Sequence, residues 1–132
     1  MTFKEKLFNV QTQIEAVKKT KENPFFKNKH ADINSVLETL SPHLERNKLL
    51  LTQPIINGNV VTTVSDVEGD EFITSSFKLP DTEDSQKIGS AITYGRRYSL
   101  VSLFCMEQED DDGNKAAGKK VTPNVSDDEL DF

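Results

Sequence analysis

The chain has 132 residues, of which 35% are hydrophobic and 29% charged, and its 16 Lys and Arg stand against 22 Asp and Glu for a net charge of −6. This length fits one ordinary domain with a tail, and no apolar run approaches the roughly 18 residues of a membrane span. The single cysteine excludes an intramolecular disulfide. Residues 1–104 hold 13 basic and 13 acidic side chains, whereas residues 105–132 hold 3 Lys against 9 Asp and Glu. Because the acid is concentrated at one end, the net charge does not exclude a nucleic-acid partner.

Two helices are predicted at the N-terminus. Thr2 and Glu5 form a T-x-x-E capping box, and apolar residues follow at helical spacing to about Lys19. Asp32 can cap the second helix, in which Ser41-Pro42 predicts a bend or a restart.

A three-stranded antiparallel meander is predicted next. Asn57-Gly58 is a strong hairpin signal, because both central residues of a type I′ turn need positive φ. Glu68-Gly69-Asp70 predicts the second turn. The strands expected on either side of these turns are Leu49–Ile56, Val60–Val67 and Phe72–Leu79.

A long helix is predicted from Gln86 to about Phe104. One of its faces carries small and apolar residues that would let it lie close against the sheet, namely Ile88, Ala91, Ile92, Gly95, Ser99 and Ser102. Its last two turns are apolar nearly all round, more than one sheet contact requires. We therefore expect a neighbouring subunit to cover an oligomer interface made of Tyr98, Leu100, Val101 and Phe104.

After Met106 the composition turns polar and acidic, which is typical of a disordered tail. The predicted fold class is therefore α+β, with a folded domain over residues 1–106 and a flexible acidic tail over 107–132. The run Glu107–Asp112 lacks the ligand pattern of an EF-hand loop, so we expect a solvated linker and no metal site. The tail ends in SDDELDF, whose candidate partner-docking residues are Asp127, Asp128, Glu129, Leu130, Asp131 and Phe132.

Two groups of residues are candidates for holding single-stranded DNA, because basic side chains neutralise phosphates and aromatic rings stack on bases. The first is a basic stretch with interleaved aromatics: Lys18, Lys19, Lys21, Phe25, Phe26, Lys27 and Lys29. An ordinary helix end with two loop-anchoring phenylalanines explains it equally well. The second group is Lys78, Lys87, Arg96 and Arg97. The two lysines also fit ordinary surface charge, and the two arginines point about 100° apart on a helix, so they are not expected to make equivalent contacts.

Residues 31–51 and the helix after the strands resemble the ERF family, the phage and prophage single-strand annealing proteins used in homologous recombination. The motif reads G-x-x-x-T-Y-x-x-R-Y-x-L, shortly followed by acidic residues. Here it comprises Gly89, Thr93, Tyr94, Arg97, Tyr98 and Leu100, then Glu109–Gly113. The resemblance implies a β-β-β-α annealing core, assembly into rings or helical filaments, and binding of single-stranded DNA without sequence preference. The tail tip resembles that of bacterial single-stranded-DNA-binding proteins, which docks onto replication and repair enzymes.

We therefore expect a non-enzymatic protein without cofactors that anneals complementary strands without ATP, in the cytoplasm of a bacterial host and encoded by a phage. Its expected partners are single-stranded DNA, further copies of itself and a host or phage replication or recombination protein bound through the tail. Two alternatives remain: a passive protein that binds and protects single strands, and an oligomeric adaptor that recruits replication or repair factors through the tail.

Overall fold

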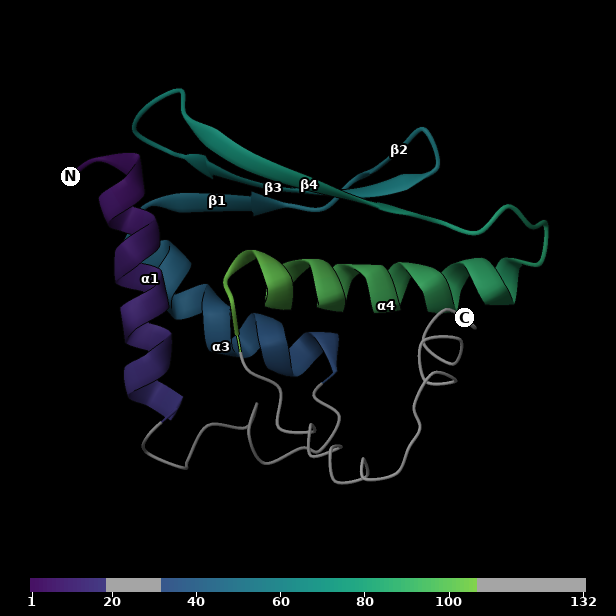
Figure 1. Cartoon of the computed structure of the whole chain (residues 1–132), viewed down its shortest axis with the longest axis horizontal. Coiled ribbons are helices and arrows are strands. Elements are labelled where there is room, and N and C mark those ends of the chain that lie inside the picture. The colour runs from purple at the N-terminus through teal and green to yellow at the C-terminus, as the bar shows by residue number, and fades with distance from the viewer. Residues whose placement is uncertain (19–31, 107–132) are drawn as a thin grey trace.

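The computed structural model describes residues 1–18 and 32–106, and for residues 15–18 it describes the backbone alone. Within these described residues, three helices lie on one side of a small antiparallel sheet (Figure 1). The elements in chain order are α1 (Phe3–Lys18), α3 (Ile33–Arg46), β1 (Leu49–Thr52), β2 (Ile55–Ile56), β3 (Asn59–Asp66), β4 (Phe72–Lys78) and α4 (Ser85–Leu103). The α+β class and the order of helices, strands and long helix predicted from the sequence are confirmed.

Helix α1 begins at the predicted capping box. The backbone N–H of Thr2 donates to Glu5 Oε1 at 2.8 Å, and the N–H of Glu5 donates to Thr2 Oγ1 at 3.0 Å. One turn later the buried Lys6 ammonium donates to Asp66 Oδ1 and Glu68 Oε1, each at 2.7 Å. These hydrogen bonds lower the pKa of both carboxyls and anchor α1 to the far end of β3.

Helix α3 has the predicted N-cap but not the predicted restart. The Asp32 carboxylate accepts a hydrogen bond from Ser35 N at 2.8 Å. The helix then runs through Pro42 to Arg46 without interruption, so a restart at Ser41-Pro42 is wrong. Pro42 lies on the exposed side, while apolar residues on both sides of it in the sequence are buried in one core. This continuous buried stripe outweighs the single backbone donor that Pro42 removes.

The sheet follows the predicted meander with one difference, an interruption in its first strand. Strands β1 and β2 pair with β3 in the same antiparallel register, and the extended run is interrupted at Gln53 and Pro54. Proline has no N–H to donate to β3, which accounts for the break. The predicted hairpin turn is confirmed, since Asn57 and Gly58 have φ of 52° and 76°. Strand β4 pairs with the other side of β3.

Helix α4 lies against the sheet through small residues, as predicted, but Ser102 of the predicted face is exposed. A Cβ on Gly95 would come within 2.5 Å of Phe77 Cδ1, and Ala91 and Ser99 on the same face are buried. Only a residue without a side chain allows the helix to approach β4 this closely.

The apolar end of α4 is covered by the chain itself. Leu100, Val101 and Phe104 are buried in a core shared with α1, α3 and the sheet. The apolar side chains that led us to expect a neighbouring subunit are therefore buried within one chain. Of the four predicted interface residues, Tyr98 is the one that stays half-buried.

The two faces of the sheet differ sharply. The helices cover one face, and no described element covers the other (Figure 1). Because side chains alternate along a strand, one set lies on this uncovered side, which we call the open face. Its residues are Leu50, Thr52, Ile56, Asn59, Val61, Thr63, Ser65, Phe72, Thr74, Ser76 and Lys78.

Candidate nucleic-acid interface

Most of the predicted DNA-binding residues lie outside the described part of the chain. This applies to Lys19, Lys21, Phe25, Phe26, Lys27 and Lys29, and equally to the tail residues Asp127 to Phe132. Lys18 is the last residue of α1, and the structure describes only its backbone. The candidates whose side chains are described are Lys78, Lys87, Arg96 and Arg97.

Arg97 lies against two tyrosine rings on α4. Its Cζ is 4.7 Å from the ring centroid of Tyr98 and 5.5 Å from that of Tyr94, and the two ring centroids are 4.3 Å apart. Arg97 and Tyr98 both lie near Tyr94 because they follow it by three and four positions, which share one face of a helix. We call these three residues the Arg–Tyr cluster. Such cation–π contacts hold a guanidinium in one orientation.

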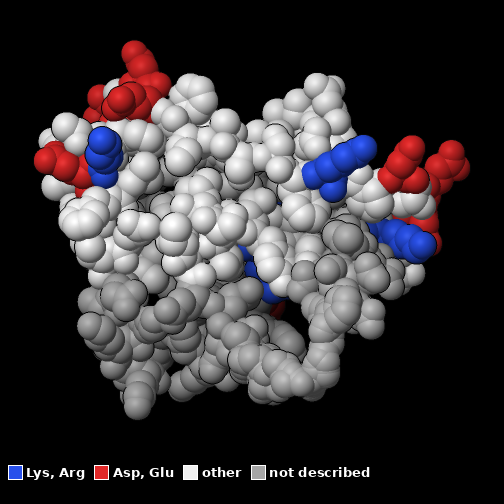
Figure 2. All heavy atoms as spheres, in the orientation of Figure 1, with Lys and Arg blue, Asp and Glu red and all other residues white. Residues whose placement is uncertain are grey.

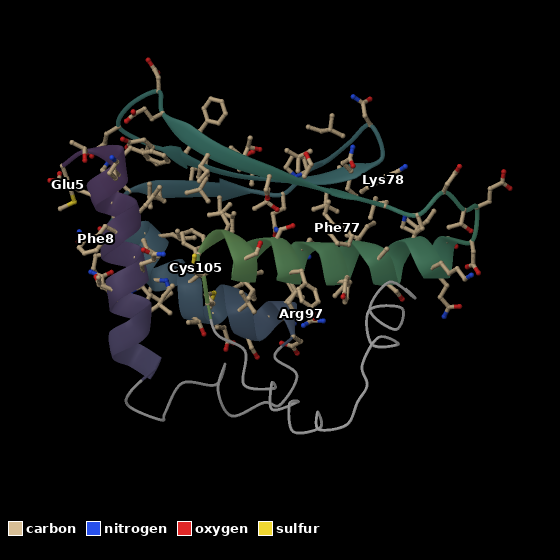
Figure 3. The ribbon with its side chains drawn as sticks, in the orientation of Figure 1. Glu5, Phe8, Phe77, Lys78, Arg97 and Cys105 are labelled. Carbon is tan, nitrogen blue, oxygen red and sulfur yellow. The ribbon has the colours of Figure 1, made fainter. Side chains whose placement is uncertain are left out.

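The aromatic contacts continue from the Arg–Tyr cluster to the sheet. The ring centroid of Tyr94 lies 5.9 Å from that of Phe77 in β4, with an interplanar angle of 60°. Tyr94 thus connects the cluster to β4, and Figure 3 shows Arg97 beneath α4, toward α3. Sequence reasoning did not group Tyr94 and Tyr98 with Arg97, although their spacings of three and four positions could have indicated it.

The Arg–Tyr cluster is also close to the N-cap of α3. The pKa of Asp32 is lowered first by hydrogen bonds from Ser35, and the positive charge of Arg97 lowers it further. In the sequence, Asp32 directly follows the lysine-bearing stretch 19–31. The cluster is thus near the residue at which that predicted basic segment joins the described fold.

Arg96 makes different contacts, as its position one residue earlier on the helix predicts. Its Nε donates to Gln53 Oε1 at 3.3 Å, while Gln53 Nε2 donates to the Arg96 carbonyl at 3.2 Å and to Thr62 Oγ1 at 3.0 Å. Arg96 therefore fastens α4 to the sheet where β1 and β2 are interrupted.

Lys78 and Lys87 are exposed, and Lys78 lies on the other side of the sheet from Arg97. Lys78 lines a hollow of about 340 Å³ between the β2–β3 turn at Asn57–Asn59 and the segment Leu79–Asp81. Figure 3 places Lys78 at the end of β4 and Arg97 beneath α4, toward α3. Among the described residues the predicted cations therefore form no single groove.

The open face is a second surface that sequence reasoning missed, apart from Lys78. The strand residues that form it include no Asp or Glu, and Thr63 and Thr74 on it share a hydrogen bond between their hydroxyls at 3.1 Å. Figure 2 shows a side of the molecule on which acidic side chains gather near the β3–β4 turn and near the start of α4, with mostly uncharged surface between. The alternation of residues could not tell which side of the sheet the helices would leave uncovered.

Among known protein families, the model of the ERF superfamily matches this chain over residues 3–129. The chain belongs to the ERF superfamily. No curated protein and no solved structure matches it.

The ERF superfamily comprises phage-type recombination and annealing proteins, and its helical motif has two structural roles in this chain. Tyr94, Arg97 and Tyr98 form the Arg–Tyr cluster, whereas Leu100 is fully buried in the core. Gly89 has nothing within 4 Å of the position its Cβ would take. The motif therefore combines a core residue, Leu100, with the partly exposed residues of the Arg–Tyr cluster.

Two further findings on this ERF-superfamily chain concern membrane-spanning helices and metal-binding groups. No helix within residues 1–18 and 32–106 is long and apolar enough to cross a membrane. In the same part of the chain, no three His, Cys, Asp or Glu side chains lie together in a group that could hold a metal ion. The acidic run Glu107–Asp112 lies outside the described residues.

Proposed function

We propose that this ERF-superfamily chain binds single-stranded DNA without sequence preference and anneals complementary strands without ATP, as a homo-oligomeric ring or helical filament in phage recombination. The observation that carries the proposal is the Arg–Tyr cluster, in which family-motif residues hold a guanidinium against two aromatic rings. Cation and ring are the two groups that a sequence-tolerant single-strand site requires.

The chemistry of the Arg–Tyr cluster suits a strand backbone. A guanidinium presents N–H donors in a planar fork that matches phosphate, and a phosphate contact releases counterions, which makes affinity depend on salt and not on sequence. Stacking of a base on an aromatic ring adds about 1–3 kcal/mol and accepts any base. We propose that Tyr98 or Tyr94 stacks on a base, that Arg97 binds the adjacent phosphate, and that Lys18 and Lys19 extend the backbone contact.

Annealing needs no covalent step by the protein. The protein has to hold two strands with their bases accessible until complementary stretches pair. The sequence contains no P-loop, in keeping with a reaction that takes its free energy from base pairing alone.

The decisive experiment measures annealing of two complementary labelled oligonucleotides at several salt concentrations, with particle imaging of the same samples. We expect the full chain to accelerate annealing over the spontaneous rate, to lose this effect as salt rises and to form closed or helical particles. Binding without acceleration would identify a passive single-strand-binding protein instead. Absence of binding even at low salt would leave the adaptor function, and either result overturns the proposal.

The DNA site is tested by replacing Lys18, Lys19 and Arg97 with Ala together. We expect weaker binding of single-stranded DNA and a smaller dependence of affinity on salt. The matched control is Lys4→Ala, which removes an exposed charge from the opposite end of α1. Unchanged affinity and salt dependence in the triple variant would show that the strand binds elsewhere, with the open face around Lys78 as the next surface to test.

The acidic tip is proposed to dock a replication or recombination protein through Leu130 and Phe132. Deletion of residues 126–132 separates docking from electrostatic competition with DNA. If the tip docks a partner, the deletion should leave DNA affinity unchanged and abolish the capture of bacterial single-strand-processing proteins by this chain. If the tip competes with DNA, the deletion should tighten DNA binding. If neither property changes, the tip has neither role.

A further inference from the structure

The outer edge of β4 carries a row of unpaired backbone groups in the described structure. Backbone bonds from Leu79 N to Gly58 O at 2.9 Å and from Asp66 N to Glu71 O at 3.0 Å set the alternation of the β3–β4 ladder. In an antiparallel pair, residues alternately bond to their partner strand and turn their N–H and C=O away from it. The residues that turn these groups outward are Phe72, Thr74, Ser76 and Lys78.

The opposite edge of the sheet is protected and β4 is not. The β1–β2 edge is interrupted at Gln53 and Pro54, and the Gln53 side chain is bonded to α4. Natural sheets commonly blunt an edge with such breaks, with prolines or with charges. Strand β4 runs unbroken for 7 residues, with neither Pro nor Gly and with one charge, at Lys78.

Strand β4 exposes two apolar side chains at this edge. Phe72 is 61% exposed and Ile73 is 39% exposed, and they lie on opposite faces of the sheet. Phe77 lies on the same face of the sheet as Ile73, because the two are four positions apart in the strand, and it is half-buried. An exposed, apolar edge of this kind is a template for another strand.

We propose that β4 pairs with β4 of a second copy of this chain, antiparallel, across a two-fold axis at Ser75. This register places Phe72 opposite Lys78 of the second copy and Thr74 opposite Ser76, so every outward N–H and C=O of the four edge residues gains a partner. On the helix side, Ile73 meets Phe77 of the second copy, which covers apolar surface on both.

Within the paired strands, the same register sets no like charges opposite one another, because the two Lys78 side chains lie at opposite ends of the pair, each opposite a Phe72 ring. Just beyond the strands, Asp70 and Glu71 of one copy lie beside Asp81 of the other, so we expect the pairing to tighten as salt screens these charges. A head-to-tail arrangement would instead set β4 beside the interrupted β1–β2 edge, where two regular segments of 4 and 2 residues are available. The self-pairing therefore matches two unbroken edges of equal length.

This pairing is independent of DNA and is tested without it. A two-fold pair closes on itself, so a ring or filament of the kind proposed above would be built from such pairs through an additional contact. Failure of the annealing assay would therefore leave the pairing intact, and failure of the pairing would leave DNA binding intact.

The register is tested by cross-linking at the two-fold axis. Ser75 and its symmetry mate form a non-hydrogen-bonded pair, whose Cα atoms lie about 4.5 Å apart, within the range of a disulfide. In a Cys105→Ser background, Ser75→Cys is expected to form a covalent dimer under mild oxidation. The matched control is Ser65→Cys on the central strand β3, which lies away from both edges. Cross-linking at position 75 no faster than at position 65 overturns the proposal.

The edge itself is tested by Ser76→Pro. This change removes one outward N–H and leaves the bonds to β3 in place, because proline is tolerated where its nitrogen faces away from the sheet. We expect the dimer dissociation constant, measured by sedimentation of the full chain, to rise about tenfold or more, since symmetry removes the bond twice. Circular dichroism checks that the Ser76→Pro variant is folded. A folded variant that associates as tightly as the parent chain, or a parent chain that stays monomeric, contradicts the pairing.

Discussion

The two sides of α4 show how one helix divides support of the fold from surface chemistry. On the sheet side, Gly95 lies so close to Phe77 that no side chain fits between them, and Ala91 is fully buried. On the other side, Arg97 and its two tyrosines are half-buried and polar. The family motif of this helix is therefore not uniform, because Leu100 is buried in the core whereas Tyr94, Arg97 and Tyr98 stay partly exposed.

The largest effect is expected in the main core, which α4 shares with α1 and α3, from Leu100→Ala. The change removes a fully buried side chain from the main core and should lower the free energy of unfolding by about 2–5 kcal/mol. Urea unfolding at several protein concentrations measures it. A loss that appears only at low concentration would instead place Leu100 at a contact between subunits.

Gly95→Val should have the next largest effect. Any Cβ at this position contacts the Phe77 ring, so we expect a loss of about 1–3 kcal/mol in the free energy of unfolding. Gly89→Val on the same helix is the matched control, because it changes helix propensity equally with nothing within 4 Å of the new Cβ. Equal midpoints of urea unfolding for the two variants would contradict the close approach of α4 and β4.

On the other side of α4, substitutions of Arg97 should affect DNA binding more than stability. We expect Arg97→Ala to weaken single-stranded DNA binding about tenfold and to reduce the salt slope by about 0.7. Arg97→Lys keeps the charge and loses the planar fork, so its affinity for DNA should lie between that of the parent chain and that of Arg97→Ala. Fluorescence anisotropy across a salt series measures both quantities. An Arg97→Lys variant as weak as Arg97→Ala would make stacking, not charge, the dominant contribution.

The smallest effect is expected at Asp32. Its pKa is lowered by the Ser35 hydrogen bonds and further by Arg97, so in Arg97→Ala we expect that pKa to rise slightly and to stay below the ordinary value of 3.8. Because the folded-state pKa is the lower one, the cap stabilises the fold above pH 3.8 and this contribution is lost as pH falls through the folded-state value. A carboxyl NMR titration of both proteins measures the shift. An identical pKa of Asp32 in both proteins would show that the charge of Arg97 does not act on the α3 N-cap.

Local signals in the sequence predicted most of the fold. The capping box at Thr2, the turn at Asn57-Gly58 and the small face around Gly95 each act over a few residues and are all confirmed. The continuity of α3 through Pro42 was missed because it depends on burial against distant elements.

The candidate site was less predictable for the same reason. Spacing alone could have grouped Tyr94, Arg97 and Tyr98, but the separation of Lys78 from Arg97 depends on how the sheet and α4 stack. The covering of Leu100 by α1 and α3 likewise depends on tertiary packing, and no local pattern reports which face of a sheet stays open.

The attachment of α1 has a consequence for the order of folding. Lys6 binds carboxylates 60 and 62 positions away, whereas the β2–β3 and β3–β4 turns join strands that are neighbours in the sequence. Contacts between distant positions require a larger loss of chain entropy before they form. We therefore expect pulse-labelled amides of the sheet to be protected before those of α1. The N-terminal helix would then close the structure last, once the β3–β4 turn has brought Asp66 and Glu68 into place.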